Sequence, residues 1–109
     1  MLLFLFLYSM KVLKYGIPIT ETNYELKIPA KHQFLNMKLF GGKHILNYLV
    51  DTESELESVF ISIVKTGQKL DKKDFELGRW QFLASNMSVE TGQQWHLFEV
   101  QGPQYFAFC

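Results

Sequence analysis

Cysteine and arginine are scarce in this sequence, and each shortage excludes something. The single cysteine, Cys109, cannot form a disulfide within the chain, and a thiolate metal site would need other ligands. That count fits a reducing compartment, and we expect a cytoplasmic protein in the host cell. Arg79 is the one arginine, although arginine is the usual bidentate reader of guanine and phosphate.

An excess of charge is also missing. Eleven basic and eleven acidic residues give a formal net charge of zero. A protein that binds nucleic acid by neutralising phosphates normally carries a basic excess or stripe, so we expect no nucleic-acid partner. A net charge near zero gives little protection against self-association.

No apolar run is long enough to span a bilayer. Residues 1–9, MLLFLFLYS, fall far short of the roughly 20 residues that a membrane-spanning helix needs. They also lack the basic start and the cleavage site of a signal peptide. Three interpretations stay open: a start upstream of a natural Met10, an ordered segment that covers an apolar surface, or a weak membrane or export signal.

Short segments of alternating apolar and polar residues indicate β-strands along the chain, and no longer stretch shows a helical period. The predicted strands cover residues 11–19, 24–29, 33–40, 43–50, 59–65, 79–88 and 94–101. We predict one domain of the all-β class, an antiparallel sandwich or open barrel of about seven strands with meander-like connections. Residues 10–100 would form its core, between the apolar extension 1–9 and the apolar tail 101–109. That tail would pack on the domain or on another subunit.

The connections carry their own signals. Gly41-Gly42 predicts a two-residue hairpin between residues 33–40 and 43–50. Pro18 cannot donate to a strand ladder, so the first strand should lie at an edge or end there. The acidic stretch 51–58 is predicted to be a solvated loop or one helical turn. The charged stretch 68–78 is predicted to be a loop.

The stretch 79–100 holds both tryptophans. Alternation places Trp80, Phe82 and Ala84 on one face of the first strand. In the second strand it places Trp95 with Leu97 and Glu99 on one face, and His96 with Phe98 and Val100 on the other.

Four residues of this stretch are candidates for ligand binding. Trp80 and Trp95 would stack on a base, with Arg79 near a phosphate, or they are two large core side chains on paired strands. His96 would contact a ligand, or it is a structural histidine hydrogen-bonded beside a core tryptophan. On a strand, His96 and Glu99 point to opposite faces, so they form no acid–base pair by themselves.

Other chemistry finds no support in the sequence. His32 and His44 lack metal-ligand spacing, so we expect no metal and no cofactor. Ser85 and Ser88 have no nucleophile-elbow context, and Cys109 has no visible activating base. We therefore predict no catalytic residue and no enzyme.

From Met10 to Val100 the chain resembles a family of short, uncharacterised proteins of phages and bacteria. The closing Trp-His-x-Phe-Glu is the most specific of the matching elements. In order, these are Met10-Lys11, Lys14-Tyr15, Ile19-Thr20, Ile28-Pro29, Leu49-Val50-Asp51, Thr66-Gly67 and Trp95-His96-Leu97-Phe98-Glu99. The pattern lacks residues 1–9 and the final GPQYFAFC, and it has a proline where Gln68-Lys69-Leu70 stands here. The resemblance implies the fold and origin but transfers no catalytic residue, since the family has no assigned activity.

Two functions remain as expectations. The first is a non-catalytic binding or interaction module, encoded by a phage or prokaryote, that acts on a protein partner or sequesters a small ligand. The alternative is a structural accessory protein of a virion or its assembly. Apolar residues at both termini predict self-association into a homo-oligomer.

Overall fold

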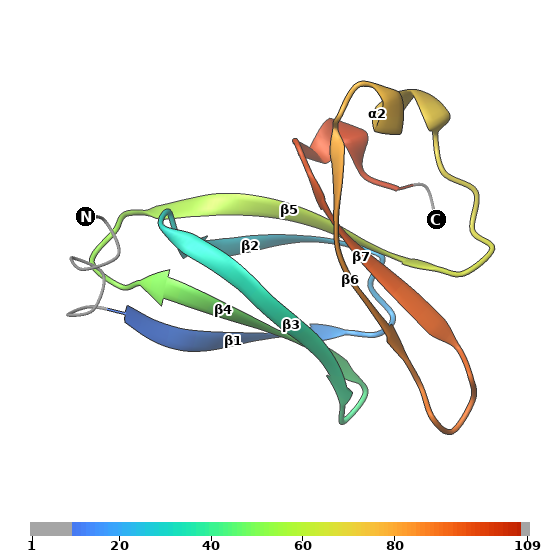
Figure 1. Cartoon of the computed structure of the whole chain (residues 1–109), viewed down its shortest axis with the longest axis horizontal. Coiled ribbons are helices and arrows are strands. Elements are labelled where there is room, and N and C mark those ends of the chain that lie inside the picture. Colours follow the sequence, from blue (N-terminus) through green and yellow to red (C-terminus); the bar gives the residue numbers. More distant parts are fainter. Residues whose placement is uncertain (1–9, 108–109) are drawn as a thin grey trace.

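The computed structural model describes residues 10–107, which form two antiparallel β-sheets (Figure 1). The elements are β1 (Met10–Pro18), β2 (Asn23–Pro29), β3 (His32–Phe40), β4 (Lys43–Asp51), β5 (Leu56–Lys65), α2 (Lys72–Glu76), β6 (Trp80–Met87), β7 (Gln94–Val100) and the 3-10 helix η1 (Pro103–Tyr105). The all-β prediction is confirmed. Of the two predicted architectures the sandwich is right, because the sheets pack together and do not close into a barrel.

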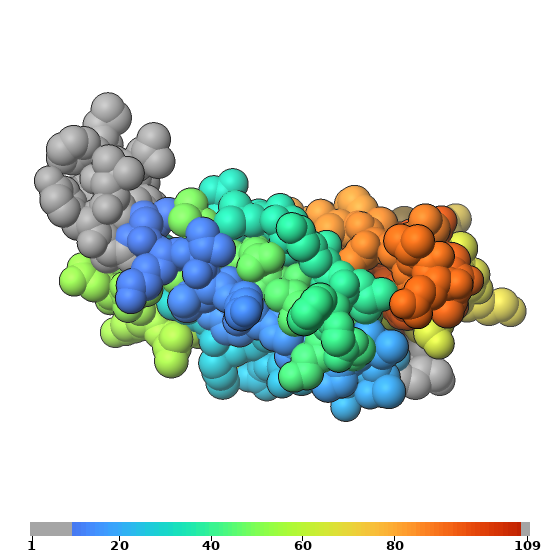
Figure 2. Space-filling view, turned by 90° about the horizontal axis from the view of Figure 1, so that it is seen from below, coloured from blue at the N-terminus to red at the C-terminus, as the bar shows by residue number. Residues whose placement is uncertain are grey.

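The three-stranded sheet has the order β1-β4-β3, and Figure 2 looks toward these strands from below. The β3–β4 hairpin turns at Gly41 and Gly42, whose φ angles are 59° and 76°. Positive φ at both positions suits the two-residue turn that matches strand twist, so the predicted hairpin is confirmed. Pro18 ends β1, which is an edge strand as predicted.

The four-stranded sheet has the order β2-β5-β7-β6, and its connections depart from the predicted meander. Only the hairpins β3–β4 and β6–β7 pair strands that follow one another in the chain. The chain changes sheet from β1 to β2, from β2 to β3 and from β4 to β5, and from β5 to β6 it stays in one sheet but skips the position that β7 fills. Local alternation shows that a strand has an apolar face, but it does not show which distant strand will pair with it.

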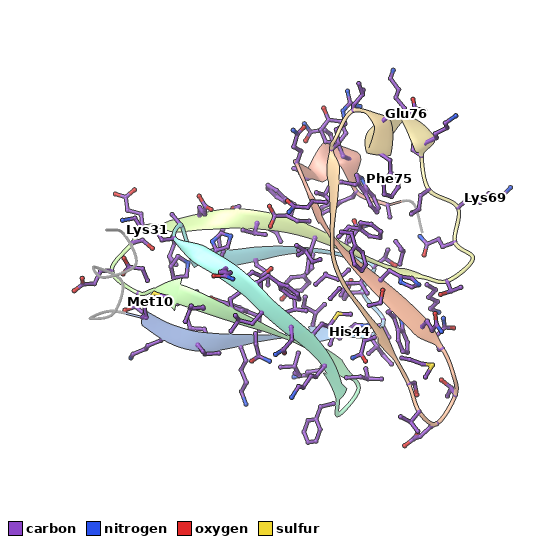
Figure 3. All side chains as sticks on the ribbon, in the orientation of Figure 1. Met10, Lys31, His44, Lys69, Phe75 and Glu76 are labelled. Carbon is purple, nitrogen blue, oxygen red and sulfur yellow. The ribbon has the colours of Figure 1, made fainter. Side chains whose placement is uncertain are left out.

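The main core lies between the two sheets, where side chains from both inner faces meet (Figure 3). Its fully buried members include Ile17, Leu46, Tyr48, Ile61 and Leu97. Trp95 and Leu97 point into this core and Phe98 and Val100 point away from it, so the predicted division of that strand into two faces is confirmed. Burial of these apolar side chains is the dominant favourable term in folding.

A β-bulge in β6 corrects the predicted faces of that strand. Phe82 pairs with Phe98 of β7, but Ala84 pairs with Leu97. The extra residue between them leaves Trp80 on the outer face of the sheet and turns Ala84 toward the core. Alternation assumes an unbroken ladder, and one inserted residue reverses every side chain that follows.

A second apolar cluster covers the outer face of the four-stranded sheet. It contains Val64, Trp80, Val100 and Ala107, beneath α2 and the C-terminal segment (Figure 1). The Trp80 indole Nε1 donates a hydrogen bond to the Tyr105 carbonyl oxygen at 2.9 Å. Of the two predicted arrangements for the tail, packing on its own domain is therefore confirmed as far as Ala107.

The short helix α2 corrects the prediction that residues 68–78 are a loop. Asp71 caps the helix, because its carboxylate accepts a hydrogen bond from the Lys73 backbone N–H at 2.9 Å. The Phe75 ring lies 5.5 Å from the rings of both Trp80 and Phe98. Five residues are too few to show a helical period, and this tertiary contact is invisible in the sequence.

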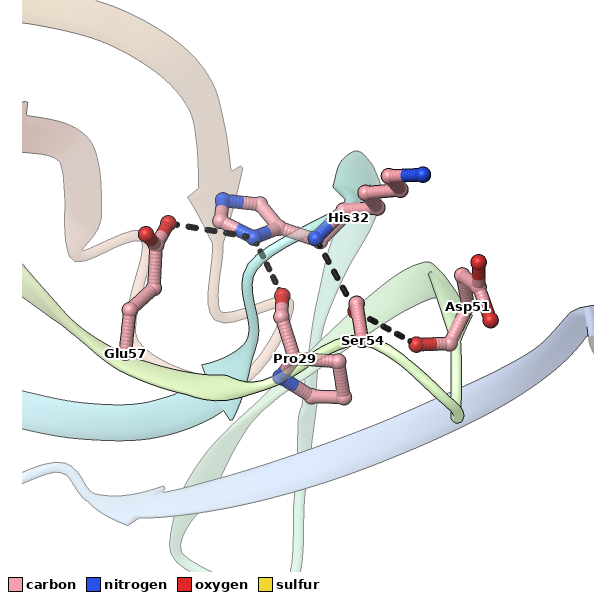
Figure 4. A network of polar contacts seen from close by, with 6 residues as sticks. Pro29, His32, Asp51, Ser54 and Glu57 are labelled. Atoms are coloured by element: carbon pink, nitrogen blue, oxygen red, sulfur yellow. Dashed lines mark hydrogen bonds and ion pairs between the residues drawn. The ribbon is translucent and has the colours of Figure 1, made fainter. Parts of the chain in front are cut away.

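The acidic connection between β4 and β5 is a fixed turn rather than a loose loop. Ser54 Oγ donates to the Asp51 carbonyl oxygen at 2.7 Å and accepts from the Lys31 backbone N–H at 3.2 Å (Figure 4). β5 begins at Leu56, earlier than the predicted start at residue 59. The acidic residues therefore stand at the end of a rigid sheet.

Candidate functional site

The tips of the β3–β4 and β6–β7 hairpins lie at the same end of the molecule (Figure 1). A cleft of about 700 Å³ is lined by residues of both tips. A hollow of about 680 Å³ adjoins it, and the two share Ile19, Thr91 and Trp95. We call this continuous depression the hairpin-tip cleft. The residues that line it from the two tips are Lys38, Leu39, Phe40, Gly41, Gly42, Asn86, Met87, Ser88, Val89 and Glu90.

Local sequence fixes both tips. Gly41 and Gly42 supply the tight turn of one hairpin, as described above. In the other, the Ser88 N–H bonds to the Gln93 carbonyl at 2.9 Å and the Gly92 N–H bonds to the Ser88 carbonyl at 2.8 Å. Gly92 has a φ of 75°, which glycine adopts without steric cost. Val89 is therefore held outward on a loop whose ends are closed.

Large apolar side chains stand exposed on both sides of the cleft. Phe40 is 77% exposed at one tip, and Val89 and Met87 are 94% and 50% exposed at the other. Single exposed apolar residues are ordinary on a protein surface. Several that surround one hollow indicate a surface that buries an apolar partner.

Trp95 reaches the cleft from the core and carries an unpaired hydrogen-bond donor. Its side chain is 7% exposed, and its indole Nε1 has no hydrogen-bond partner among residues 10–107. A buried donor without a partner costs about 1–3 kcal/mol, so the protein carries this cost beside the cleft.

His44 lies behind Trp95, on the other sheet. The two ring centroids are 5.1 Å apart and the ring planes meet at 72° (His44 is labelled in Figure 3). His44 is fully buried, and neither of its ring nitrogens has a partner in the described part of the chain. Burial lowers the pKa of His44, so the imidazole is neutral at pH 7.

The rim of the cleft carries opposite charges. Lys38 lies on the β3–β4 tip and Glu90 on the β6–β7 tip. Apolar walls, a few polar groups and one unpaired donor are the composition of a binding site. Across residues 10–107, no three His, Cys, Asp or Glu side chains gather closely enough to hold a metal ion.

Of the four residues predicted from sequence, Trp95 lines the cleft and the other three lie on the opposite face of the four-stranded sheet or beside it. Arg79 Nη1 bonds to Asp74 Oδ1 at 3.2 Å, and its guanidinium lies 4.3 Å from the Tyr105 ring centroid. Trp80 is 8% exposed in the outer cluster. Arg79 and Trp80 thus join α2 and the C-terminal segment to the sheet.

His96 lies between two hydroxyl groups on that outer face. Its Nδ1 is 2.7 Å from Ser85 Oγ and its Nε2 is 2.7 Å from Thr66 Oγ1. Thr66 donates its own proton to Gln94 Oε1 at 3.3 Å, so it accepts from Nε2–H, and Ser85 donates to Nδ1. A serine that donates to histidine is the first half of a catalytic triad. Here the third member is a neutral hydroxyl, which stabilises an imidazolium less than a carboxylate does.

The structure therefore does not combine the four predicted residues into one site. Trp80 and Trp95 project from opposite faces of their sheet. Trp80 pairs with Val100 and His96 with Ser85, a separation of four residues or about 13 Å along β7. The two tryptophans cannot stack on the same base.

Sequence reasoning missed Phe40, Met87, Val89 and His44. One signal was present: Phe40 directly precedes Gly41-Gly42, and Val89 stands in a turn segment where polar residues are usual. The two hairpin tips come to lie beside one another only in the folded chain, so the sequence could not predict the cleft between them. Nothing local indicated that His44 would meet Trp95.

The fold and the cleft define a small antiparallel β-sandwich with a binding-type depression at one end. A family model described as domain of unknown function (DUF7352) matches residues 9–105, and the chain belongs to that family. Comparison with curated proteins and with solved structures gave no match. Along the described range 10–107, none of the helices is long and apolar enough to cross a membrane.

Proposed function

We propose that this protein is a non-catalytic interaction module whose hairpin-tip cleft binds a segment of a protein partner. The observation that carries the proposal is the exposure of Phe40 and Val89 on either side of a hollow that Trp95 also lines. A bulky apolar side chain of the partner would fill the hollow and pack against the exposed Phe40 and Val89.

A small ligand is the second occupant to consider. The volume of about 700 Å³ lies within the range of about 300–1,000 Å³ of small-molecule sites. Such sites usually enclose most of their ligand, whereas this cleft opens between two protruding turns. We therefore place the protein partner first.

The non-catalytic assignment rests on the available titratable groups. His44 is buried and neutral, and the Ser85–His96 pair ends on the neutral Thr66 hydroxyl. Neither arrangement gives a nucleophile with a base that a charged group orients.

The origin and location remain part of the proposal. The elements that resemble phage and bacterial proteins, including Trp95-His96-Leu97-Phe98-Glu99, lie within the residues that match the family model. We infer a phage or prokaryotic gene and a site of action in the host cytoplasm, in line with the single cysteine.

The test is quantitative capture from the host cell with three forms of the full chain. The wild-type protein is compared with the double variant Phe40→Ser/Val89→Ser and with Leu77→Ser, which removes an apolar side chain that is 53% exposed away from the cleft. The captured amount of a true partner, measured by mass spectrometry, should be at least about tenfold lower with the double variant and unchanged with Leu77→Ser. A native mass spectrum of the purified protein checks for a retained small molecule. If the double variant retains every protein and every small molecule that the wild type retains, the proposal is contradicted.

The alternative is a structural accessory role in a virion or its assembly. Exposed apolar side chains at protruding tips also suit contacts with neighbouring subunits. Of Phe40 and Val89, Val89 is the more exposed, at 94%. Mass spectrometry of purified particles decides this point, because an assembly component must be found in them.

A further inference from the structure

The two sheets differ in how their outer faces are covered. α2 and the C-terminal segment cover the four-stranded sheet. The outer face of the three-stranded sheet has no such cover among residues 10–107 (Figure 1 and Figure 2). Val12 there is 59% exposed.

A hollow of about 400 Å³ lies on this uncovered face. It is lined by Lys14, Gly16, Phe40, Gly41, Lys43 and Ile45, which we call the lysine hollow. The two glycines have no side chains to fill the space, and Phe40 and Ile45 make apolar walls. A β-carbon added at Gly16 would lie 3.2 Å from Lys43 Cδ and 3.5 Å from Ile45 Cδ1, so the hollow is a direct result of that glycine.

The two charged residues that line the hollow, Lys14 and Lys43, are both positive. Lys38 lies on the neighbouring strand β3 opposite Ile45, and none of the three lysines takes part in an ion pair within the described residues. Glu21 follows in the turn beside the hairpin tip, while Asp51 stands at the far end of the same face. An apolar hollow between unpaired lysines calls for an apolar side chain flanked by acids.

This chain carries such a segment at the other end of the sandwich, where β4 leads into β5 of the four-stranded sheet. Leu56 is 68% exposed, and it follows the exposed Glu53 and Glu55 of the β4–β5 turn. The lysine hollow and the acidic turn therefore lie at opposite ends of the sandwich, although the formal charge of the whole chain is zero.

The acidic turn is already ordered, which favours binding. The Ser54 bonds in Figure 4 hold it, the Glu53 N–H bonds to Asp51 Oδ1 at 3.0 Å, and the Ala30 N–H bonds to the Glu55 carbonyl at 2.6 Å. A segment that is fixed before association loses little conformational entropy when it docks.

We propose that copies of this chain associate head to tail, with Leu56 of one copy in the lysine hollow of the next and Glu53 and Glu55 beside Lys14 and Lys43. The contact joins two different surfaces, so it builds an open chain with a free hollow and a free turn at its ends, or a ring where the rotation closes. The lysine hollow opens on a different face from the hairpin-tip cleft, although Phe40 and Gly41 line both.

The size of the face limits the strength of the contact. Three strands of nine residues offer about 30 × 14 Å, or roughly 400 Å² for each partner. The total of roughly 800 Å² lies at the weak, transient end of protein interfaces. We therefore expect association that is reversible, appears at high protein concentration and weakens with salt.

Sedimentation velocity of the full chain tests the proposal, from about 10 μM to about 1 mM protein at low salt and again in about 0.5 M salt. The variants are Lys14→Glu/Lys43→Glu, Glu53→Lys/Glu55→Lys and the hollow-filling Gly16→Val, none of which alters the hairpin-tip cleft. The matched control is Lys69→Glu/Lys72→Glu, which makes the same change in net charge at exposed positions elsewhere. Circular dichroism confirms that each variant is folded.

The wild type and the control should associate at low salt and dissociate at high salt. Each reversed variant alone, and Gly16→Val, should associate at least about tenfold more weakly. An equimolar mixture of the two reversed variants should associate again, because each then supplies the surface that complements the other. A wild type that stays monomeric overturns the proposal. So does association that the reversed variants leave unchanged, or that their mixture fails to restore.

Discussion

The ring of His44 on β4 lies 5.1 Å from the Trp95 indole on β7, and the two planes meet at 72°. The contact joins the two sheets directly beneath the hairpin-tip cleft. Both residues are buried and both carry nitrogen atoms without a hydrogen-bond partner in the described part of the chain. The base of the cleft is thus less well satisfied than the rest of the core, as binding sites often are.

Stability should fall in mild acid because of His44. Burial lowers its folded-state pKa from the ordinary 6.5, so the unfolded chain takes up a proton at a higher pH than the folded chain does. The free energy of unfolding should therefore decrease as the pH drops from about 7 through 6.5, and level off below the folded-state pKa. Urea unfolding over a pH series measures this.

The variant His44→Leu should lose that dependence on pH and be at least as stable as the wild type at pH 7, because it removes two unpaired buried nitrogens. His96→Gln, on the outer face, should keep the dependence. If the free energy of unfolding decreases equally with falling pH in the wild type and in His44→Leu, another group causes the effect.

Tyr48 should tolerate loss of its hydroxyl. That hydroxyl is buried and has no partner within residues 10–107, while Tyr15, His32 and Phe34 surround the ring. Tyr48→Phe should change the free energy of unfolding by less than about 1 kcal/mol, or raise it. Thermal unfolding tests this, and a loss of more than about 2 kcal/mol would show that the hydroxyl is bonded.

Tyr48 should also make the protein less stable in alkali. Burial, with smaller contributions from Glu99 and Tyr15, raises the pKa of Tyr48 above its ordinary 10.0. The unfolded chain then loses the phenol proton first, so stability is full below pH 10 and decreases above it. Tyr48→Phe should reduce this decrease, whereas Tyr24→Phe, at a side chain that is 38% exposed, should not.

Asn23 should hold the C-terminal segment against the sheet. Its amide donates to the Ala107 carbonyl at 2.8 Å, and its oxygen accepts from the Ala107 N–H at 3.1 Å and from Ser62 Oγ at 2.5 Å. Asn23→Ala leaves the fully buried Ser62 with a weaker set of partners and should cost about 1–3 kcal/mol.

Hydrogen exchange should then show faster exchange of the Ala107 amide. Asn36→Ala is the matched control, because it also removes an asparagine side-chain hydrogen bond, the exposed one to Asn47 at 2.8 Å. It should cost less than about 0.5 kcal/mol. Equal effects of the two substitutions would count against a specific tie.

Gly42 should resist substitution for a reason other than space. Its φ is 76°, and no atom lies within 4 Å of an added β-carbon. Gly42→Ala should therefore cost about 1 kcal/mol from backbone strain alone. Gly16→Ala, in strand β1 where φ is ordinary and the nearest atom belongs to a flexible lysine, should be neutral or slightly stabilising. Thermal unfolding that ranks the two variants the other way would contradict this.

Only Trp95 of the candidate site could be predicted from the sequence. A tryptophan in an alternating strand either packs in the core or contacts a ligand, and Trp95 both packs in the core and lines the cleft. Arg79 and Trp80 are neighbours in sequence and His96 lies in the next strand, but all three make structural contacts on the outer face of the sheet or beside it. Phe40 and Val89 are 49 residues apart and become a pair only when their hairpins stand side by side.

The sequence by itself determined the class of the fold, because a strand of period two and a glycine turn depend on atoms a few residues apart. It placed the Gly41-Gly42 hairpin, the edge position of β1 and the shared face of Trp95 and Leu97 correctly. The tertiary structure alone decided which strands pair, where a bulge reverses β6, and which exposed apolar residues face one another. Those outcomes depend on packing between segments far apart in the chain, and no local pattern records them.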